Sequence, residues 1–312
     1  MTVEEARRST ELYAEMMSPR HNLSSVVDTV VPGPAGAIPI RVYRPGSTAS
    51  GVLVYFHGGG WTLGDLDTSD PNCRGLAAIA NCVVVSVDYR LAPEHRFPAA
   101  VEDGWAAIAW AARNAYVLGS STSRVAVGGE SSGGNIAAAV ALRARIDRQV
   151  DLALQLLIYP PLDFSFETRS YEECSEGFVL TRKAMEWYWA QYLRTPADGR
   201  NSYASPLQAE HLEALAPALI FTAEYDPLRD EAEEYGARLA QSGVRAEIVR
   251  CVGQIHGFFA FGSVTRDAHG ATLERAAERL RAEFAAPTTR LQTNGFQESK
   301  HHPLHTPTGV VP

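Results

Sequence analysis

A serine stands at the centre of the sequence Gly-Glu-Ser-Ser-Gly at residues 129–133, directly after the apolar run 124–128. A strand that enters Gly-x-Ser-x-Gly and continues into a helix forms a nucleophile elbow, a sharp turn that exposes the serine hydroxyl. The flanking glycines are expected to be required because side chains there would collide. The helix predicted over 132–146 would direct its free N–H groups at Ser131, where they stabilise a negative charge.

A second glycine-rich motif, His-Gly-Gly-Gly-Trp at residues 57–61, follows the strand-like run 51–56. Successive glycines allow a substrate to approach the backbone closely. Oriented backbone N–H groups stabilise the negative oxygen of a tetrahedral intermediate in acyl transfer. A loop of this composition supplies part of the oxyanion hole in hydrolases that carry the serine elbow. The alternative interpretation is an ordinary flexible loop after a strand.

An acidic partner is expected after the serine in the chain. Asp226 falls just beyond the carboxyl end of the buried strand predicted over 217–223, where catalytic groups of α/β sheets gather. The alternative is that Asp226 only caps the helix that follows. Glu224, Asp230 and Glu231 are rival acids, of which the last two lie inside that helix and are expected to face solvent or cap it.

The base is sought among nine histidines. His256 follows the strand-like run 246–252 and comes after both the serine and the acid, as the Ser, Asp, His order requires. His57 belongs to the glycine loop, and the other histidines precede the serine, lack a strand end before them or lie in a polar tail. We therefore predict Ser131 as nucleophile, His256 as base and Asp226 as the acid that orients it.

Together with two further segments, these motifs resemble the hormone-sensitive-lipase-like family of α/β-hydrolases, also called bacterial lipolytic family IV. The two segments are Asp-Tyr-Arg-Leu-Ala-Pro-Glu-His-Arg-Phe-Pro-Ala-Ala at 88–100 and Asp-Pro-Leu-Arg-Asp-Glu at 226–231. The resemblance covers roughly residues 20–285. It implies an α/β-hydrolase fold, the same triad, and oxyanion donors from the residues Gly59, Gly60 and Ser132.

The chain departs from this family beside the nucleophile. Family members usually have Asp before the serine and Ala after it, where this chain has Glu130 and Ser132. A backbone donor at Ser132 survives that change, so the triad assignment stands. The surroundings of the serine are expected to differ.

The elements that would position these residues alternate along the chain. We expect strands near 26–31, 38–43, 52–57, 82–88, 124–128, 153–159, 217–223 and 246–252, with helices at 98–115, 132–146, 228–242 and 271–285. This alternation predicts a mostly parallel eight-stranded sheet with helices on both faces, opened by two antiparallel strands.

Two stretches interrupt the alternation. Residues 1–20 have the pattern of an amphipathic helix, and 164–212 form a long insertion between two strands. Long insertions in compact folds are usually functional lids. We therefore expect one hydrolase domain over 1–285, with a helical cap formed by about 1–25 and 164–212. Residues 286–312, rich in Pro, Thr, His and Gln, are expected to be a disordered tail.

Four aromatic residues are expected to contact the substrate: Trp61 beside the glycine loop, Phe258 beside the base, and Trp187 and Tyr188 in the cap. Large rigid rings crowd a pocket and leave a short apolar slot. The family resemblance supplies the corresponding range of acyl chains, about two to eight carbons.

Composition limits the partners of this 312-residue chain. Its net charge of −8 argues against binding to nucleic acid or to anionic membranes, and no apolar run approaches a membrane span. Four cysteines without paired spacing and a polar N-terminus indicate a reduced, cytoplasmic protein. We expect a small-molecule ester as substrate, no metal or organic cofactor, and a homodimer formed through the edge strand 246–252. A metal site at His301, His302 and His305 is disfavoured because acidic partners are sparse there.

Three other functions remain open at this stage. An amidase needs the same constellation as an esterase, and the family contains carboxylesterase-like dehydratases. Some members are hormone receptors that have lost catalytic residues, and the complete triad disfavours that interpretation here.

Overall fold

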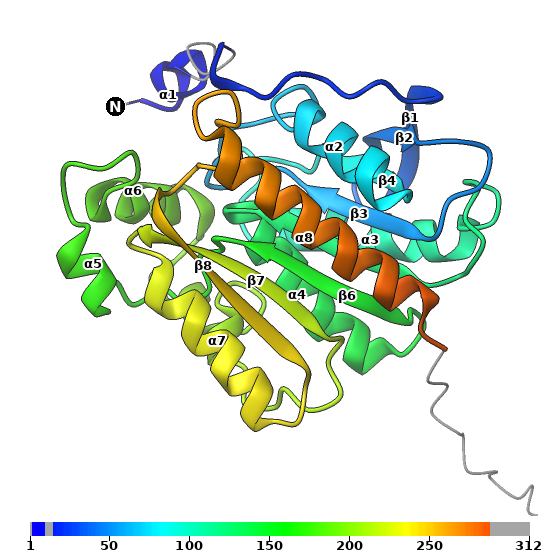
Figure 1. The fold of residues 1–312 in the computed structure, drawn as a ribbon. Helices are drawn as coiled ribbons and strands as arrows, with labels where there is room; N and C mark the ends of the chain where they lie inside the picture. Colours follow the sequence, from blue (N-terminus) through cyan, green and yellow to red (C-terminus); the bar gives the residue numbers. More distant parts are fainter. Residues whose placement is uncertain (1, 10–14, 288–312) are drawn as a thin grey trace, which may run out of the picture.

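The protein is described by a computed structural model that covers residues 2–9 and 15–287. Its centre is an eight-stranded sheet in the order β1-β2-β4-β3-β5-β6-β7-β8 (Figure 1). The strands are β1 (Ser25–Gly33), β2 (Gly36–Arg44), β3 (Val52–Phe56), β4 (Val83–Val87), β5 (Val125–Glu130), β6 (Leu152–Ile158), β7 (Ala218–Tyr225) and β8 (Ala246–Ile255). β2 pairs antiparallel with both β1 and β4, and all other pairs are parallel. The predicted α/β-hydrolase sheet is thus confirmed, including its antiparallel opening.

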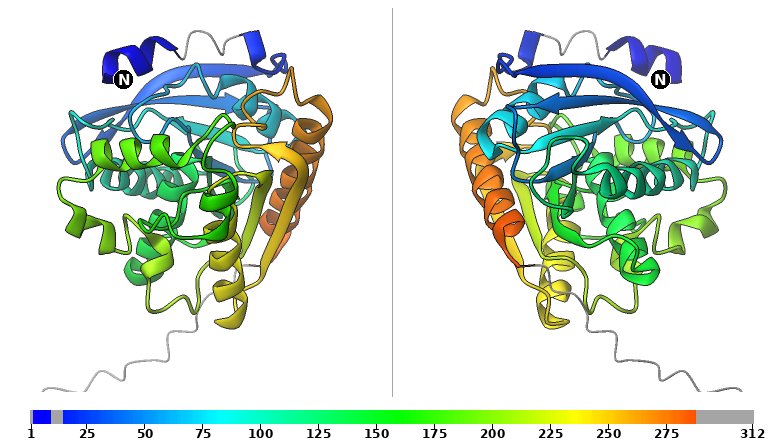
Figure 2. Two further views of the ribbon diagram at one scale, coloured as in Figure 1. Left: turned by 90° about the vertical axis from the view of Figure 1, so that its left-hand side faces the viewer. Right: turned by 90° about the vertical axis from the view of Figure 1, so that its right-hand side faces the viewer.

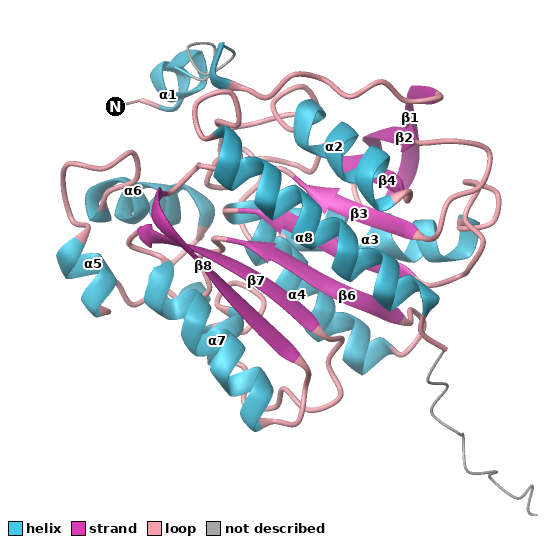
Figure 3. Cartoon of the chain, viewed as in Figure 1, coloured by secondary structure: helices cyan, strands magenta, loops and turns pink. Residues whose placement is uncertain are grey.

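Helices cover both faces of the sheet, as the two side views and the view coloured by secondary structure show (Figures 2 and 3). The long helices are α2 (Asp70–Ala80), α3 (Ala99–Asn114), α4 (Ser132–Asp147), α7 (Arg229–Gln241) and α8 (Arg266–Ala285). α2 and α8 belong to the core on one face, and α3, α4 and α7 to the core on the other. α2 is absent from the helices predicted from the sequence; Pro71 starts its first turn, and Asn81 ends the helix in a left-handed conformation.

The central strands are apolar on both sides because each face of the sheet is buried. In β3, Val52, Val54 and Phe56 enter one core, whereas Leu53 and Tyr55 enter the other. Successive side chains of a strand point to opposite faces of the sheet, and here both faces are covered by a hydrophobic layer. Each parallel strand therefore has a defined set of side chains on each face of the sheet. The candidate site lies at the carboxyl ends of these strands.

The segments assigned to the cap contain short elements. The insertion 164–212 holds α5 (Arg169–Glu173), α6 (Arg182–Tyr192) and two 3-10 turns at Pro196–Arg200 and Pro206–Gln208. Near the N-terminus, α1 is described over Val3–Ser9, whereas residues 18–23 have no regular structure, so the predicted helix does not extend to residue 20. Pro19 disfavours helical geometry at the residue before it.

Some expectations concern residues that are not described. The predicted disordered tail spans 286–312, and only its first two positions are described. Its three histidines lie outside the described residues. Among the described residues, no helix has both the length and the apolar composition needed to cross a membrane.

Candidate active site

The nucleophile elbow forms where β5 passes into α4. Ser131 has a φ of 51°, a left-handed conformation that a residue with a side chain rarely adopts. A Cβ at Gly129 would lie 2.4 Å from the carbonyl carbon of Gly133, and a Cβ at Gly133 would lie 2.0 Å from the carbonyl oxygen of Phe56. Both glycines are therefore required for the turn to close against β3, as the sequence predicted.

Three side chains from three strand ends meet at this turn. The hydroxyl of Ser131 lies 3.0 Å from Nε2 of His256, and Nδ1 of His256 donates to Oδ2 of Asp226 at 2.7 Å. Asp226 is fully buried, and its other oxygen accepts the N–H of Leu228 at 2.9 Å. A buried carboxylate that accepts from Nδ1 fixes the imidazole with Nε2 free to receive a proton from the serine.

The rival acids lie elsewhere. Glu224 accepts the N–H of Gly253, and Asp230 accepts the N–H of Ser170 at the start of α5. Glu231 does not face solvent, contrary to the expectation for this helix. Its side chain is fully buried and accepts the N–H of Leu162, and burial raises its pKa well above the usual value. This face of α7 packs towards the segment after β6, a contact that no local pattern in the sequence reveals.

The glycine loop lies beside the nucleophile. Gly59 and Gly60 have φ values of 115° and 59°, and both line the same cavity as Ser131. Ser132 is the first residue of α4, so its N–H is one of the helix-starting groups that have no acceptor within the helix. The three residues predicted as oxyanion donors are thus grouped around the serine.

His57, the first residue of the glycine loop, packs against a tyrosine. The ring of His57 stacks on Tyr89 at 4.3 Å, and the hydroxyl of Tyr89 donates to the carbonyl of His57 at 2.9 Å. Burial lowers the pKa of His57 to about 4, so this imidazole is neutral at ordinary pH. His57 therefore supports the loop by packing and is held away from proton transfer.

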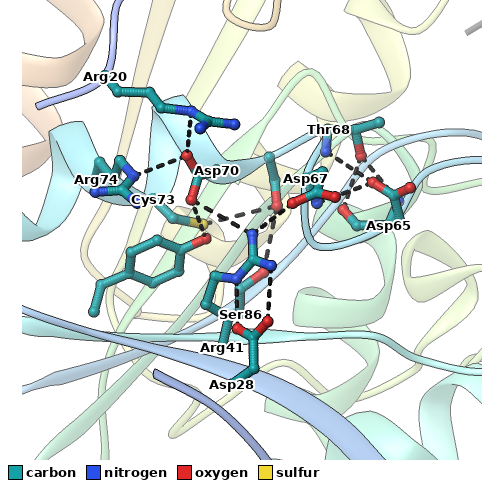
Figure 4. A network of polar contacts seen from close by, with 12 residues as sticks. Arg20, Asp28, Arg41, Asp65, Asp67, Thr68, Asp70, Cys73, Arg74 and Ser86 are labelled. Atoms are coloured by element: carbon teal, nitrogen blue, oxygen red, sulfur yellow. Dashed lines mark hydrogen bonds and ion pairs between the residues drawn. The ribbon is translucent and has the colours of Figure 1, made fainter. Parts of the chain in front are cut away.

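The chain that continues from the glycine loop is anchored by a charged network (Figure 4). Asp70, at the start of α2, is 1% exposed and contacts three guanidinium groups. Arg20 and Arg74 lie 2.8 Å from Oδ2 of Asp70, and Arg41 lies 3.5 Å from Oδ1. Arg41 also pairs with Asp28 on β1. The network therefore joins the N-terminal segment, the first two strands and α2.

The serine opens onto an apolar cavity of about 200 Å³. Its walls come from the glycine loop, the cap and the loop after β8. Of the four aromatics expected to bind substrate, Trp61 and Tyr188 line it. The cavity is also lined by residues that were not predicted as site residues, among them Met17, Leu63, Thr68, Val179, Leu180, Met185 and Phe261. The three-residue spacing of Met185 and Tyr188 on α6 could have indicated a shared face.

The other two expected aromatics lie outside the cavity lining. Phe258 is fully buried in the core, edge-on to Tyr159 at 5.4 Å, because the chain turns at Gly257 and sends the next side chain beneath the loop. Trp187 packs edge-on against Tyr188 at 5.1 Å. Adjacent residues of a helix differ by about 100° in direction, so only one of this pair faces the serine. The prediction that Phe258 and Trp187 contact substrate is not supported.

The two segments that the sequence predicts to form a cap both contact the cavity. Val179, Leu180, Met185 and Tyr188 of the insertion line the cavity, as does Met17 of the N-terminal segment. Stacking holds the insertion to the glycine loop, since the rings of Trp61 and Tyr192 lie 4.1 Å apart at 3°. Both segments predicted to form the cap thus contribute walls to the cavity.

Comparison with known proteins places this arrangement in a family. The α/β hydrolase fold family matches residues 53–260. The chain belongs to the hormone-sensitive-lipase-like family of α/β-hydrolases. Within the family, it is 49% identical over 244 residues to the carboxylic ester hydrolase LipN of Mycobacterium tuberculosis, a match that covers 75% of this chain and 64% of LipN. It is 41% identical over 263 residues to the esterase LipI of the same organism, covering 81% of each.

A solved structure of the family has the same overall shape. The hyperthermophilic esterase of Pyrobaculum calidifontis superposes with a TM-score of 0.84 at 42% identity, covering 92% of this chain and 95% of the esterase.

Proposed function

We propose that this α/β-hydrolase is a serine carboxylesterase that hydrolyses esters of short- to medium-chain carboxylic acids through an acyl-enzyme. The observation that carries the proposal is the hydrogen-bonded series Ser131–His256–Asp226, with distances of 3.0 Å and 2.7 Å, at the wall of an apolar cavity. Ester hydrolysis is also the activity named for the relatives LipN and LipI.

The first half of the reaction forms the acyl-enzyme. His256 takes the proton of Ser131 as the serine oxygen attacks the ester carbonyl, and Asp226 stabilises the positive charge on the imidazole. The C–O bond to the alcohol then breaks, and the proton on His256 passes to the departing alcohol. In the second half, His256 removes a proton from water, the hydroxide attacks the acyl carbon, and the acid leaves as Ser131 recovers its proton.

The negative oxygen that forms in each half is stabilised by the N–H groups of Gly59, Gly60 and Ser132. Donors that are already oriented by the loop and by the start of α4 need no reorganisation, and loss of one such donor typically costs 10²–10³-fold in kcat. No metal ion or organic cofactor is needed for these steps.

The cavity favours short acyl chains. Its volume is about 200 Å³, and Tyr188 and Met185 of α6 and Leu180 before it are among the side chains that line it. Each methylene that fits contributes about 0.8 kcal/mol, whereas one that does not fit causes strain. We therefore place the optimum within acyl chains of about two to eight carbons, with Trp61 and Tyr188 as substrate-contacting aromatics.

A panel of p-nitrophenyl esters from acetate to palmitate, assayed beside matched anilides, tests this function. We expect the highest kcat/KM between acetate and octanoate, far lower values for palmitate and for the anilides, and no jump in rate at the substrate's micelle concentration. Comparable values for butyrate and palmitate would indicate a lipase, and preferred cleavage of anilides would indicate an amidase.

We propose in addition that the protein forms a symmetric homodimer through β8. This strand lies at the edge of the sheet, with Val252 76% and Ile248 39% exposed. An open edge with exposed apolar residues favours pairing with another chain. Light scattering at micromolar concentration should report twice the chain mass of 33.9 kDa, and less for Val252→Asp.

Val264→Asp is the matched control for the dimer, since Val264 is 68% exposed but lies outside the strand. It should leave the measured mass unchanged. A wild-type protein that remains monomeric at micromolar concentration would refute the dimer.

We also propose a cytoplasmic location. Its support is that all four cysteines are free thiols, of which Cys73, Cys82 and Cys174 are buried, a pattern usual in reducing compartments. Fractionation of the native host with antibody detection tests it, and recovery from the extracellular fraction would contradict it.

A further inference from the structure

Glu130 is a buried acid that the reaction outlined above does not use. It ends β5 immediately before the nucleophile, is 5% exposed and lines the same cavity. Carboxylates are rarely buried unless they have partners. The carboxylate of Glu130 is therefore expected to have polar partners that hold its negative charge.

Three groups from different parts of the fold face the carboxylate. Asn72 of α2 donates to Oε2 at 3.1 Å, and the hydroxyl of Tyr159 donates to the same oxygen at 3.4 Å. The backbone N–H of Gly58 in the glycine loop also interacts with it and lowers its pKa. Glu130 thus connects α2, the end of β6 and the glycine loop directly behind Ser131.

Tyr159 extends this connection to the base. Its ring lies 4.6 Å from the ring of His256, and it is 2% exposed. The tyrosine that donates to Glu130 therefore also packs against the imidazole of His256. In addition, a positive charge on His256 lowers the pKa of Glu130, so the two side chains are close enough for their charges to interact.

We propose that Glu130 is a positioning residue for this reaction: its carboxylate fixes Tyr159 against His256 and favours the imidazolium that forms when Ser131 loses its proton. The proposal rests on the esterase function proposed above. It assigns a role in the reaction to the residue at which this chain departs from the usual Asp of its family.

The proposal predicts a distinct dependence on pH. Burial raises the pKa of Glu130 to about 7, so the carboxyl becomes neutral as the pH falls through that value. The other titratable groups that face it are Tyr55 on β3, Cys73 on α2, Tyr89 and Tyr159. Burial raises the pKa of each of these four above its usual value, so they stay neutral between pH 5 and 9. Within this cluster, Glu130 is therefore the group whose ionisation between pH 5 and 9 should appear in the pH profile.

The test is the pH profile of kcat/KM for p-nitrophenyl butyrate in wild type, Glu130→Gln and Glu130→Asp. In wild type, the logarithm of kcat/KM should fall with a slope greater than 1 over about one pH unit near pH 7, where Glu130 becomes neutral, and less steeply below that region. Glu130→Gln should be about 10-fold less active at pH 8, equivalent to one pKa unit of lost charge stabilisation, and its profile should lack the steeper region near pH 7. Glu130→Asp keeps the charge and should keep the steeper slope.

Tyr159→Phe supplies a second, independent readout. The hydroxyl of Tyr159 lowers the pKa of Glu130, so its removal should move the Glu130 ionisation, and with it the acid limb, to higher pH. A merely structural role would lower activity equally at all pH values. This variant keeps the ring and so remains informative if Glu130→Gln fails to fold.

A Glu130→Gln profile with the wild-type slope, whether its activity is unchanged or uniformly reduced, would overturn the proposal. So would an unshifted acid limb in Tyr159→Phe. Failure of the esterase function itself is recognised separately, because wild type would then not hydrolyse the butyrate ester at pH 8.

Discussion

The ring of Tyr188 on the cap helix α6 packs directly on Gly60 of the glycine loop. A Cβ built on Gly60 would lie 2.1 Å from Cδ1 of this ring. α6 therefore does more than line the cavity, since its Tyr188 sets the space available to a residue whose N–H is proposed for the oxyanion hole.

Gly60→Ala should lower kcat for p-nitrophenyl butyrate by about 10²-fold, the order expected when one oxyanion donor is displaced. The added methyl group and the ring of Tyr188 cannot occupy the same space, so the loop or the ring must move. The double variant Gly60→Ala/Tyr188→Ala should recover part of the loss by removing the ring. Gly46→Ala, where nothing lies within 4 Å of the new methyl group, is the control. Wild-type kcat in Gly60→Ala would contradict the assignment.

Tyr188→Ala alone should lengthen the acyl pocket. Removing the ring opens space for additional methylenes, each contributing about 0.8 kcal/mol or about 4-fold in kcat/KM when it fits. The ratio of kcat/KM for decanoate to that for butyrate should rise by about 10-fold. Trp187→Ala removes a comparable ring that does not line the cavity and should leave this ratio near wild type. A larger change in Trp187→Ala than in Tyr188→Ala would show that the cap presents its other face to the substrate.

The neighbouring pair Trp187 and Tyr188 also marks the limit of what the sequence alone predicts. The composition of this segment indicated an aromatic helix in a cap, and that helix is present as Arg182–Tyr192. Which of two adjacent rings faces the serine depends on how the helix is rotated against the glycine loop, a tertiary property. The same reasoning applies to Glu231, whose burial depends on a contact with the backbone of Leu162.

By contrast, the residues of the serine turn were predictable because their constraints are local. Gly129 and Gly133 are required by collisions within five residues and with the adjacent strand. The strands that end at these positions are continuous apolar runs, which are typical of a sheet buried on both faces. The order of serine, acid and base along the chain then selected one candidate of each type.

Asp70→Asn should destabilise the fold by about 3 kcal/mol, because three guanidinium groups would then face a neutral amide at a buried position. Equilibrium unfolding in urea measures this change. Asp67→Asn is the matched control, since Asp67 pairs with the same Arg41 but its side chain is 73% exposed. The control should lose less than about 1 kcal/mol. Equal losses in the two variants would show that burial of Asp70 does not govern the strength of the network.

The central claim is that Ser131, His256 and Asp226 act as one catalytic unit in ester hydrolysis. The most direct measurement is kcat for p-nitrophenyl butyrate in folded Ser131→Ala, His256→Ala and the double variant, with circular dichroism to establish folding. Each single variant should lose roughly 10⁴-fold or more, and the double variant little beyond that, because members of a triad act as a unit. Near-normal turnover by folded Ser131→Ala, or multiplied losses in the double variant, would contradict the mechanism.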